Sequence, residues 1–330
     1  MTMTTTVTTD TDRFDEEQQA DRFGDLLRRL SRQSVVKHFD AYADVPWDDP
    51  DYAIDPTDPR WELPADSALG GTGWYRSLPA DTRARLGLHD VASKMKAGLQ
   101  FENVLKRGLL EYAWRLPDDS PEFRYAYHEV IEEAQHSLMF QEFVNRAGLE
   151  TPGLTWDMRL GTRNVIRMAR RFPALFFVFV LGGEDPIDHL QRSVLRSGDE
   201  LHPLLERIMR IHITEEARHL SFARCYLRTH VPGLPARQRR AIAVRAPLIL
   251  GQMAGVMMRP PRHLVRTYDI PRPVLRQAYG PGTPSRQEVK DSLRKVRHLL
   301  VELDLVTPTT KRLWRRFDLW DDAETKFAAG

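Results

Sequence analysis

Residues 132–136 read EEAQH and residues 215–219 read EEARH, and these two stretches decide the fold that the sequence predicts. Each ends in Glu-x-x-His with the same three-residue spacing. Residues three or four apart share one face of a helix, so each pattern aims a carboxylate and an imidazole at a common point. The two pairs are Glu133 with His136 and Glu216 with His219.

One isolated carboxylate precedes each pattern inside an apolar helical segment. Glu102 stands in LQFENVL, 31 residues before Glu133, and Glu184 follows the apolar run FVFVLGG, 32 residues before Glu216. Burying an unpaired carboxylate costs several kcal/mol or forces it to take up a proton. Two such carboxylates at matched distances therefore predict a positive group in the core.

The donor set indicates which positive group this is. Carboxylate oxygens and imidazole nitrogens without thiolate suit iron or manganese. The single cysteine, Cys225, excludes a disulfide framework and a thiolate-rich zinc or iron–sulfur site. Ferritin-like carboxylate bundles take one Glu from each of two helices and Glu-x-x-His from each of the other two, and such carboxylates can hold two metals about 3.5–4 Å apart. The sequence thus predicts an all-α fold, with a ferritin-like four-helix bundle core and additional helices.

The second copy of the pattern carries one more candidate ligand. His212 lies four residues before Glu216 and seven before His219, so all three side chains fall on one helix face. The equivalent place in the first copy holds Glu129. We therefore expect an asymmetric pair of metal sites, one of which has an additional histidine.

A further glutamate directly precedes each Glu-x-x-His, Glu132 in the first copy and Glu215 in the second. These side chains could accept the second N–H of a ligating imidazole and fix its tautomer; as ordinary helix charges they would instead face solvent. Glu132 could also replace Glu133 as the ligand, because a spacing of four to His136 works as well. We prefer Glu133 because its spacing matches that of Glu216.

Helical periodicity covers most of the chain, and no alternating strand pattern is present. Proline and glycine separate the expected helices, notably at Pro117, Gly148, Gly182–Gly183 and Pro232. We expect helices near residues 91–116, 121–147, 155–181, 183–197, 200–230, 236–258, 271–279, 285–303 and 308–317, and a helical pattern also covers 13–39.

Composition limits the remaining classes. Basic and acidic residues nearly cancel, 48 against 46 among 330 residues, so no global field draws the protein to nucleic acid. The Thr-rich start lacks the cationic and apolar regions of a signal peptide, and the longest apolar run, 174–183, is too short to span a membrane. We expect a cytoplasmic protein with a partly disordered N-terminal tail over 1–33 and one ferritin-like domain over 34–330.

The sequence resembles the non-haem diiron arylamine N-oxygenases, the p-aminobenzoate N-oxygenase (AurF-like) family, in the order of its candidate ligands. That order is Glu102, Glu133-x-x-His136, Glu184 and His212-x-x-x-Glu216-x-x-His219. The additional histidine one turn before the last Glu-x-x-His separates this family from acyl desaturases, ribonucleotide reductase small subunits and ferritins. The segment DVPWDDP at 44–50 is similar to the family's N-terminal lead-in. By resemblance, these seven residues would be metal ligands in a ferritin-like bundle that is usually a homodimer.

The resemblance also implies a reaction. In this family a reduced diiron centre activates O₂ and oxidises an aromatic amine towards hydroxylamine, nitroso and nitro products. The cofactors would be two iron ions, with manganese possible, and O₂ would be the co-substrate. No glycine fingerprint for a flavin or nicotinamide is present, so we expect a separate electron donor or reductase.

Two other hypotheses remain open at this point. A diiron hydroxylase or desaturase would use a similar ligand set on C–H bonds, although the additional His212 favours oxidation of nitrogen. A non-catalytic iron-binding bundle belongs to another class, and this chain is nearly twice the length that a storage bundle requires. The arginine-rich segment 237–266 predicts an interaction surface, in a homodimer or for a reductase, because no nucleic-acid module accompanies it.

Overall fold

The computed structural model describes residues 10–198 and 200–321, and within these ranges every regular element is a helix. The all-α, ferritin-like fold class is therefore confirmed. The elements are α1 (Asp10–Val36), η1 (Pro50–Tyr52), η2 (Pro59–Trp61), α2 (Gly73–Arg76), α3 (Ala80–Ala113), α4 (Pro121–Ala147), α5 (Trp156–Arg171), α6 (Pro173–Arg196), α7 (Pro203–His230), α8 (Ala236–Met257), α9 (Arg262–Thr267), α10 (Arg272–Tyr279), α11 (Pro284–Ser292), α12 (Arg294–Glu302) and α13 (Pro308–Arg316).

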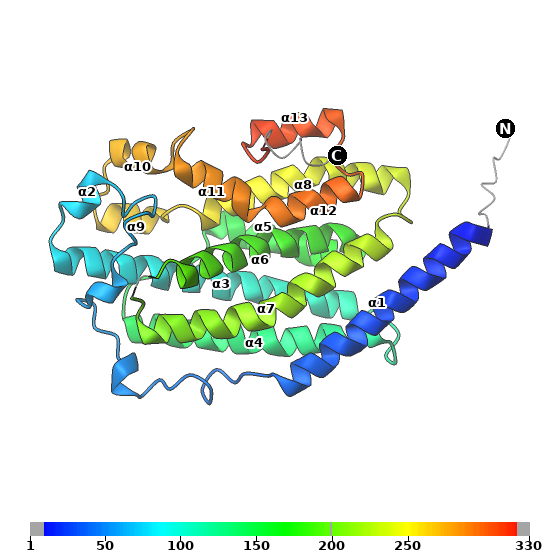
Figure 1. Ribbon diagram of the computed structural model, residues 1–330, viewed down its shortest axis with the longest axis horizontal. Helices are drawn as coiled ribbons and strands as arrows, with labels where there is room; N and C mark the ends of the chain where they lie inside the picture. The colour runs from blue at the N-terminus through cyan, green and yellow to red at the C-terminus, as the bar shows by residue number, and fades with distance from the viewer. Residues whose placement is uncertain (1–9, 199, 322–330) are drawn as a thin grey trace.

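Four long helices, α3, α4, α6 and α7, form the bundle at the centre of the molecule (Figure 1). Helix α3 packs on α4, and α6 packs on α7. Helix α1 lies across α4 and α7, α5 covers α3 and α6, and α8 lies on α6. The short helices α11 and α12 pack on α6, and α13 packs on α8. The bundle therefore has a second layer on one side and a single diagonal helix on the other.

Aromatic side chains fill the bundle core beside the predicted ligands. Phe176 and Phe177 of α6 are fully buried, as is Phe222 of α7. The rings of Phe177 and Phe222 meet edge to face with their centroids 5.1 Å apart. Burial of each such side chain contributes roughly 1.5–3 kcal/mol, so this packing fixes the positions of α6 and α7 relative to each other.

Helices α4 and α7, which carry the two Glu-x-x-His patterns, begin at clear caps. The Ser120 Oγ accepts a hydrogen bond from the backbone N–H of Phe123, and Pro121 follows at the first helical position. The backbone N–H of Leu204 donates to the ring of His202 at the start of α7. Gly148 ends α4 in the left-handed conformation, with φ of 62°, as the glycine in the sequence predicts.

The predicted break at Gly182–Gly183 is wrong. Helix α5 ends at Arg171, and Phe172 separates it from α6, which runs without interruption from Pro173 to Arg196. A Cβ added at Gly183 would lie 2.1 Å from the ring of Phe101, and one at Gly182 would lie 2.7 Å from Leu250. The two glycines are therefore contact points that bring α3 and α8 close to α6, a role that local sequence does not reveal.

Three other helix boundaries differ from the predictions. Helix α3 starts at Ala80 instead of near residue 91, so the stretch just before residue 91, where no helix was expected, is helical. The helix expected over 285–303 is two helices separated at Leu293. The helix Arg262–Thr267 was not predicted. These errors leave the four bundle helices in their predicted order.

The helical pattern predicted over 13–39 corresponds to α1, which packs against α4 and α7. Phe23, Leu27 and Leu30 of this helix are buried in the main hydrophobic cluster. Residues 1–9 of the predicted tail lie outside the described residues. The division into a tail over 1–33 and a domain over 34–330 stays a prediction.

By length and composition, one helical stretch among the described residues, Ala236–Thr267, could cross a membrane. This is weak evidence, because the core helix of a soluble protein passes the same test. In this structure α8 packs against α6 and α13, and its Ile242, Ala246 and Leu250 are buried. We therefore treat α8 as a helix of the second layer.

Candidate metal centre

The bundle brings the seven predicted ligand residues into one buried cluster. Each is at most 1% exposed. Helix α3 supplies one, α4 two, α6 one and α7 three. In that order they are Glu102; Glu133 and His136; Glu184; and His212, Glu216 and His219.

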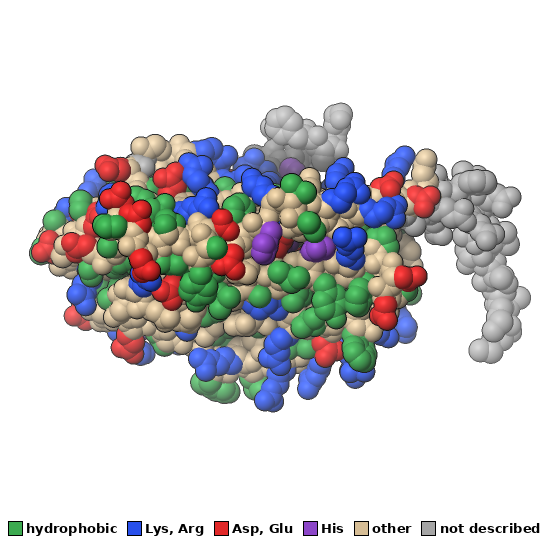
Figure 2. Space-filling model, turned by 90° about the horizontal axis from the view of Figure 1, so that it is seen from below, with side chains coloured by type: hydrophobic (Ala, Val, Ile, Leu, Met, Phe, Trp, Pro, Cys, Tyr) green, Lys and Arg blue, Asp and Glu red, His purple; other side chains and the backbone are tan. Residues whose placement is uncertain are grey.

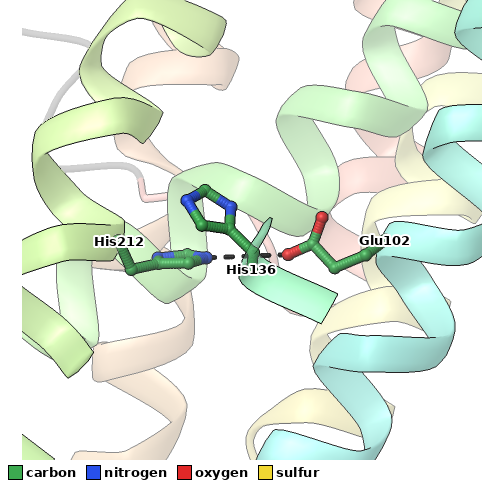
Figure 3. A group of neighbouring side chains, drawn as sticks. All are labelled: Glu102, His136 and His212. Atoms are coloured by element: carbon green, nitrogen blue, oxygen red, sulfur yellow. Dashed lines mark ion pairs between the residues drawn. The ribbon is translucent and has the colours of Figure 1, made fainter. Parts of the chain in front are cut away.

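Donor atoms from different helices meet at several points in this cluster. In each of four groups of three residues, the donor atoms lie within 4.8 Å of one another: Glu102, His136 and His212; Glu133, His136 and Glu216; Glu184, His212 and Glu216; and Glu102, Glu133 and Glu184. Figure 3 shows the first group, in which Glu102 and His212 point toward each other beside the ring of His136. The separation between His212 Nε2 and Glu102 Oε1 is 3.7 Å. Six of the seven residues belong to at least one of these four groups. The seventh, His219, belongs to a fifth group together with Glu129 and Glu133.

The two Glu-x-x-His histidines present the same nitrogen to the cluster. The Nδ1 atom of His219 lies 3.1 Å from Glu133 Oε1 and 3.1 Å from Glu216 Oε1. The Nδ1 atom of His136 lies 3.3 Å from Glu133 Oε2 and 3.5 Å from Glu216 Oε1. Both rings are thus oriented with Nδ1 inward and Nε2 outward.

Each outward nitrogen is held by the glutamate of the opposite copy. His136 Nε2 lies 2.9 Å from Glu215 Oε2, and His219 Nε2 lies 2.8 Å from Glu132 Oε2. Arg218 Nη2 donates to Glu132 Oε1 at 2.7 Å and lies 3.5 Å from Glu215 Oε1. A carboxylate that accepts the Nε2–H leaves the Nδ1 lone pair free to bind a metal. The crossing between copies depends on tertiary structure, and the sequence indicated only that these carboxylates could serve a histidine.

The ring of the third histidine, His212, is held by an amide instead of a carboxylate. His212 Nδ1 donates to Gln191 Oε1 of α6 at 2.9 Å, and its Nε2 has no hydrogen-bond partner. Burial lowers the pKa of His212 to about 4, so the ring is neutral at pH 7. The ring of Phe140 lies beside it, with centroids 5.3 Å apart, on the apolar side of the cluster. The free Nε2 lone pair therefore faces the carboxylates.

Many polar atoms of the cluster lack any partner, which tests whether the residues fit a metal. Buried polar atoms are normally hydrogen-bonded, because an unsatisfied one costs about 1–3 kcal/mol. The atoms without a partner here are Glu102 Oε2, both carboxylate oxygens of Glu129 and of Glu184, Glu133 Oε1, Glu216 Oε2 and His212 Nε2. Oxygen and neutral imidazole donors that converge without partners fit a divalent cation of the iron or manganese type.

Two carboxylates of the cluster, Glu184 and Glu129, have raised pKa values that indicate too little positive charge around them. Burial raises the pKa of Glu184 well above its ordinary value, and the charges of Glu216 and Glu133 raise it further. Burial also raises the pKa of Glu129 to about 7. A cation bound among these groups would favour their ionised forms.

The pKa values of the two inward histidines are also raised, although burial by itself would lower them. Burial lowers the pKa of His136, but its hydrogen bonds to Glu133 and Glu215 outweigh this and raise it to about 10. Burial likewise opposes the charge on His219, yet the surrounding carboxylates raise its pKa well above the ordinary value. Protons on these rings thus supply positive charge to the metal-free cluster. Metal binding would have to displace them.

Three residues of the site lie outside the sequence-based ligand set. The sequence pattern marks Glu129 only as the counterpart of His212, and it marks neither Arg218 nor Gln191. Glu129 follows the same helix face as Glu133 and His136, so its periodicity could have identified it. Gln191 could not be found in this way, because its contact with His212 joins two helices.

The fold and the cluster together define the class: a ferritin-like helical bundle whose core holds carboxylate and histidine donors of the kind that bind two metal ions. The chain belongs to the AurF family, since the model described as "P-aminobenzoate N-oxygenase AurF" matches residues 21–304. The resemblance in the sequence is confirmed, and the family supports a diiron N-oxygenase-like class of enzyme.

Three mycobacterial proteins are similar to this chain over most of their length. They are the uncharacterized proteins MT0908 and Rv0885 of Mycobacterium tuberculosis (strains CDC 1551 / Oshkosh and ATCC 25618 / H37Rv) and Mb0909 of Mycobacterium bovis (strain ATCC BAA-935 / AF2122/97). Each is 40% identical over 291 residues, which is 88% of this chain and 86% of the relative. No solved structure matches the chain.

Proposed function

We propose that this protein is a diiron monooxygenase that activates O₂ and oxidises the nitrogen of an aromatic amine to hydroxylamine, nitroso or nitro products. The observation that carries the proposal is the convergence of buried, unpartnered donor atoms from four helices in a member of the AurF family. When bound, two iron ions would supply the electrons and open coordination positions that O₂ activation needs; manganese would fit the same donors.

We assign metal binding to the seven residues of the cluster, with Glu133 in preference to Glu132. Both oxygens of Glu132 are already engaged, one by Arg218 and one by His219. The oxygens of Glu133, in contrast, face the inward Nδ1 atoms, with Oε1 3.1 Å from His219 and Oε2 3.3 Å from His136. The support for Glu132 and Glu215 as orienting residues is their contact with the outward Nε2 atoms.

The protein's own residues would prepare the site in two ways. Glu132 and Glu215 would hold the two inward histidines in the Nδ1-free tautomer, while Gln191 would do the same for the Nε2 of His212. The apolar walls, including the ring of Phe140 beside His212, would keep bulk water away from the reacting atoms. The additional histidine supports an asymmetric pair of metals.

Electrons would come from a separate donor protein, and the surface formed by α5 and α8 is a suitable place for it to bind. Helix α8 contains no acidic residue and four arginines, and α5 contains five arginines and one aspartate. Arg167, Arg171 and Arg245 line a groove of about 390 Å³ with an apolar floor that includes Phe172 and Leu175. A basic rim around an apolar centre suits an acidic electron carrier.

We further propose that the enzyme is a cytoplasmic homodimer. Apolar side chains on the outer faces of α3 and α4 are unusually exposed, which favours a second copy as their cover. Figure 2 shows groups of hydrophobic side chains on the side of the molecule where α4 and α1 lie. The exposed set is Leu110 (41%), Trp114 (87%), Tyr127 (41%), Ile131 (50%) and Leu138 (45%).

Metal analysis and product analysis together test the proposed function. Purified protein should contain close to two iron or manganese ions per chain. After anaerobic reduction, addition of O₂ with arylamines such as p-aminobenzoate should yield N-oxygenated products by mass spectrometry. Hydroxylated carbon products would support the alternative of a C–H hydroxylase. Metal without any O₂ reactivity would support a non-catalytic iron-binding bundle, and a folded protein that takes up no metal would contradict every metalloenzyme hypothesis.

A further inference from the structure

Glu129 is a member of the buried cluster that has no place among the seven assigned ligands. It lies on α4, four residues before Glu133, and is 0% exposed. Neither of its carboxylate oxygens has a hydrogen-bond partner among the described residues. One of these oxygens lies within 4.8 Å of donor atoms of both Glu133 and His219.

Within residues 10–198 and 200–321, every other buried carboxylate that is not one of the seven proposed ligands has a basic partner. Glu129 is the exception. A buried acid without one is unstable, because desolvation is not offset by any attraction. The partnered acids are Asp90 with Lys94, Glu132 with Arg218, Asp185 with Arg224, Asp188 with Arg192, and Glu215 with His136. Glu129 thus resembles Glu184, whose two oxygens also lack a hydrogen-bond partner, and differs from the structural acids.

Its place in the repeat supports the same conclusion. Glu129 precedes Glu133 by four residues and His136 by seven, and His212 stands in the same relation to Glu216 and His219. Both residues are fully buried and both present unpartnered donor atoms to the cluster. The first copy therefore offers an oxygen donor at the position where the second copy offers nitrogen.

We propose that Glu129 is an additional metal ligand that binds the same ion as His219 and Glu133. This inference rests on the proposed diiron function, and it deepens it. The two metals would then differ in their donors, because His212 adds a nitrogen to the cluster and Glu129 adds an oxygen. An oxygen-rich shell suits harder ions such as manganese more than a nitrogen-rich shell does.

Binding of Mn²⁺ to the full chain tests the proposal without relying on catalysis. The variant Glu129→Gln keeps the shape of the side chain and removes its charge. We expect wild type to bind two Mn²⁺ ions by equilibrium dialysis and electron paramagnetic resonance. Glu129→Gln should bind one of the two at least about tenfold more weakly, since even residues that only orient ligands change metal affinity 10–100-fold. The matched control is Glu122→Gln on the same helix, whose side chain bonds Tyr112 and belongs to none of the donor groups of the cluster.

Thermal unfolding supplies a second measurement that a folding defect would not imitate. Without metal, Glu129→Gln should melt at a higher temperature than wild type, because it removes an uncompensated buried acid. With saturating Mn²⁺, its gain in melting temperature should be smaller than that of wild type. Glu129→Asp serves as the second variant: its shorter side chain should also weaken Mn²⁺ binding.

The possible failures are distinguishable. Equal Mn²⁺ affinities and equal metal-induced stabilisation in wild type and Glu129→Gln would overturn the assignment of Glu129 while leaving the seven-ligand site intact. Failure of wild type itself to bind Mn²⁺ or Fe²⁺ would overturn the proposed function, and the ligand role of Glu129 with it.

Discussion

The two Glu-x-x-His copies on α4 and α7 agree where they face the buried donor cluster and differ at the residue before each histidine. Both turn a histidine Nδ1 inward toward Glu133 and Glu216. The residue before each histidine differs, however. Gln135 on α4 binds the segment after α1, accepting from the backbone N–H of Ala41 and donating to Asp40.

Its counterpart on α7, Arg218, points instead to the two carboxylates that orient the histidines, Glu132 and Glu215. The first copy therefore anchors the N-terminal segment, and the second supplies positive charge to the supports of both copies. The two copies thus keep the same donor residues. The residue before the histidine, Gln135 or Arg218, decides which copy stabilises the negative charge of Glu132 and Glu215.

The largest effect should come from the glutamates that both histidines approach. Glu133→Ala and Glu216→Ala should each reduce bound metal from about two ions per chain to fewer than one, because each carboxylate lies near the Nδ1 of both His136 and His219. Metal content by mass spectrometry would measure this. Loss of only one ion in either variant would show that the copies act independently, and Glu142→Ala on the outside of α4 is the control.

A second prediction converts one copy into the other. Arg218→Gln changes EEARH to EEAQH and removes the arginine from the buried carboxylates Glu132 and Glu215, which then keep only their histidine partners. Removing one partner of a buried ion pair typically destabilises by about 3–5 kcal/mol, so urea unfolding should detect a loss of that order. Gln135→Ala in the first copy removes one hydrogen bond from a backbone N–H and one to the half-exposed Asp40 carboxylate, and the two together should cost about 1–3 kcal/mol. Equal losses in the two variants would contradict the division of roles.

The role of His212 can be tested by changing Gln191, which accepts the hydrogen bond from its ring. Gln191→Leu removes the acceptor for His212 Nδ1, and we expect metal affinity to fall about 10–100-fold. Gln191→Glu, which restores an acceptor, should recover most of that affinity. The control is Gln141→Leu, whose amide contacts Lys96 and Asn145 outside the cluster. No recovery by glutamate would argue against an orienting role.

The smallest effect concerns pH. Burial raises the pKa of Glu129 to about 7 and that of Asp185 to about 6, above the value of about 4 in an unfolded chain. Protonation of these groups therefore favours the folded state, and that stability is lost as pH rises from about 4.5 through about 7. Metal-free protein should melt higher at pH 5.5 than at pH 7.5. Saturating metal should reverse this dependence on pH, because its ligands must be deprotonated. Calorimetry of chelated and metal-loaded samples at both pH values measures the four melting temperatures. The same dependence on pH in both samples would contradict the prediction.

Much of the candidate site was predictable because side chains that share a helix face recur at a fixed spacing in the sequence. The spacings of Glu133 to His136 and of Glu216 to His219 fix shared helix faces, and isolated acids in apolar segments mark burial. The same local logic failed at Gly182–Gly183, where the pattern predicted a break. Those glycines make room for Leu250 and Phe101, which lie 68 and 82 positions away in the chain, so no local window could identify their role.

The sequence by itself determined the helical class, the order of the bundle helices and the set of donors, because these follow from side chains a few residues apart. Only the tertiary structure decided that Glu132 serves His219, that Glu215 serves His136, and that Gln191 supports His212. Those partners lie on different helices, and their contacts depend on how the helices are placed against one another by the packing of the whole core.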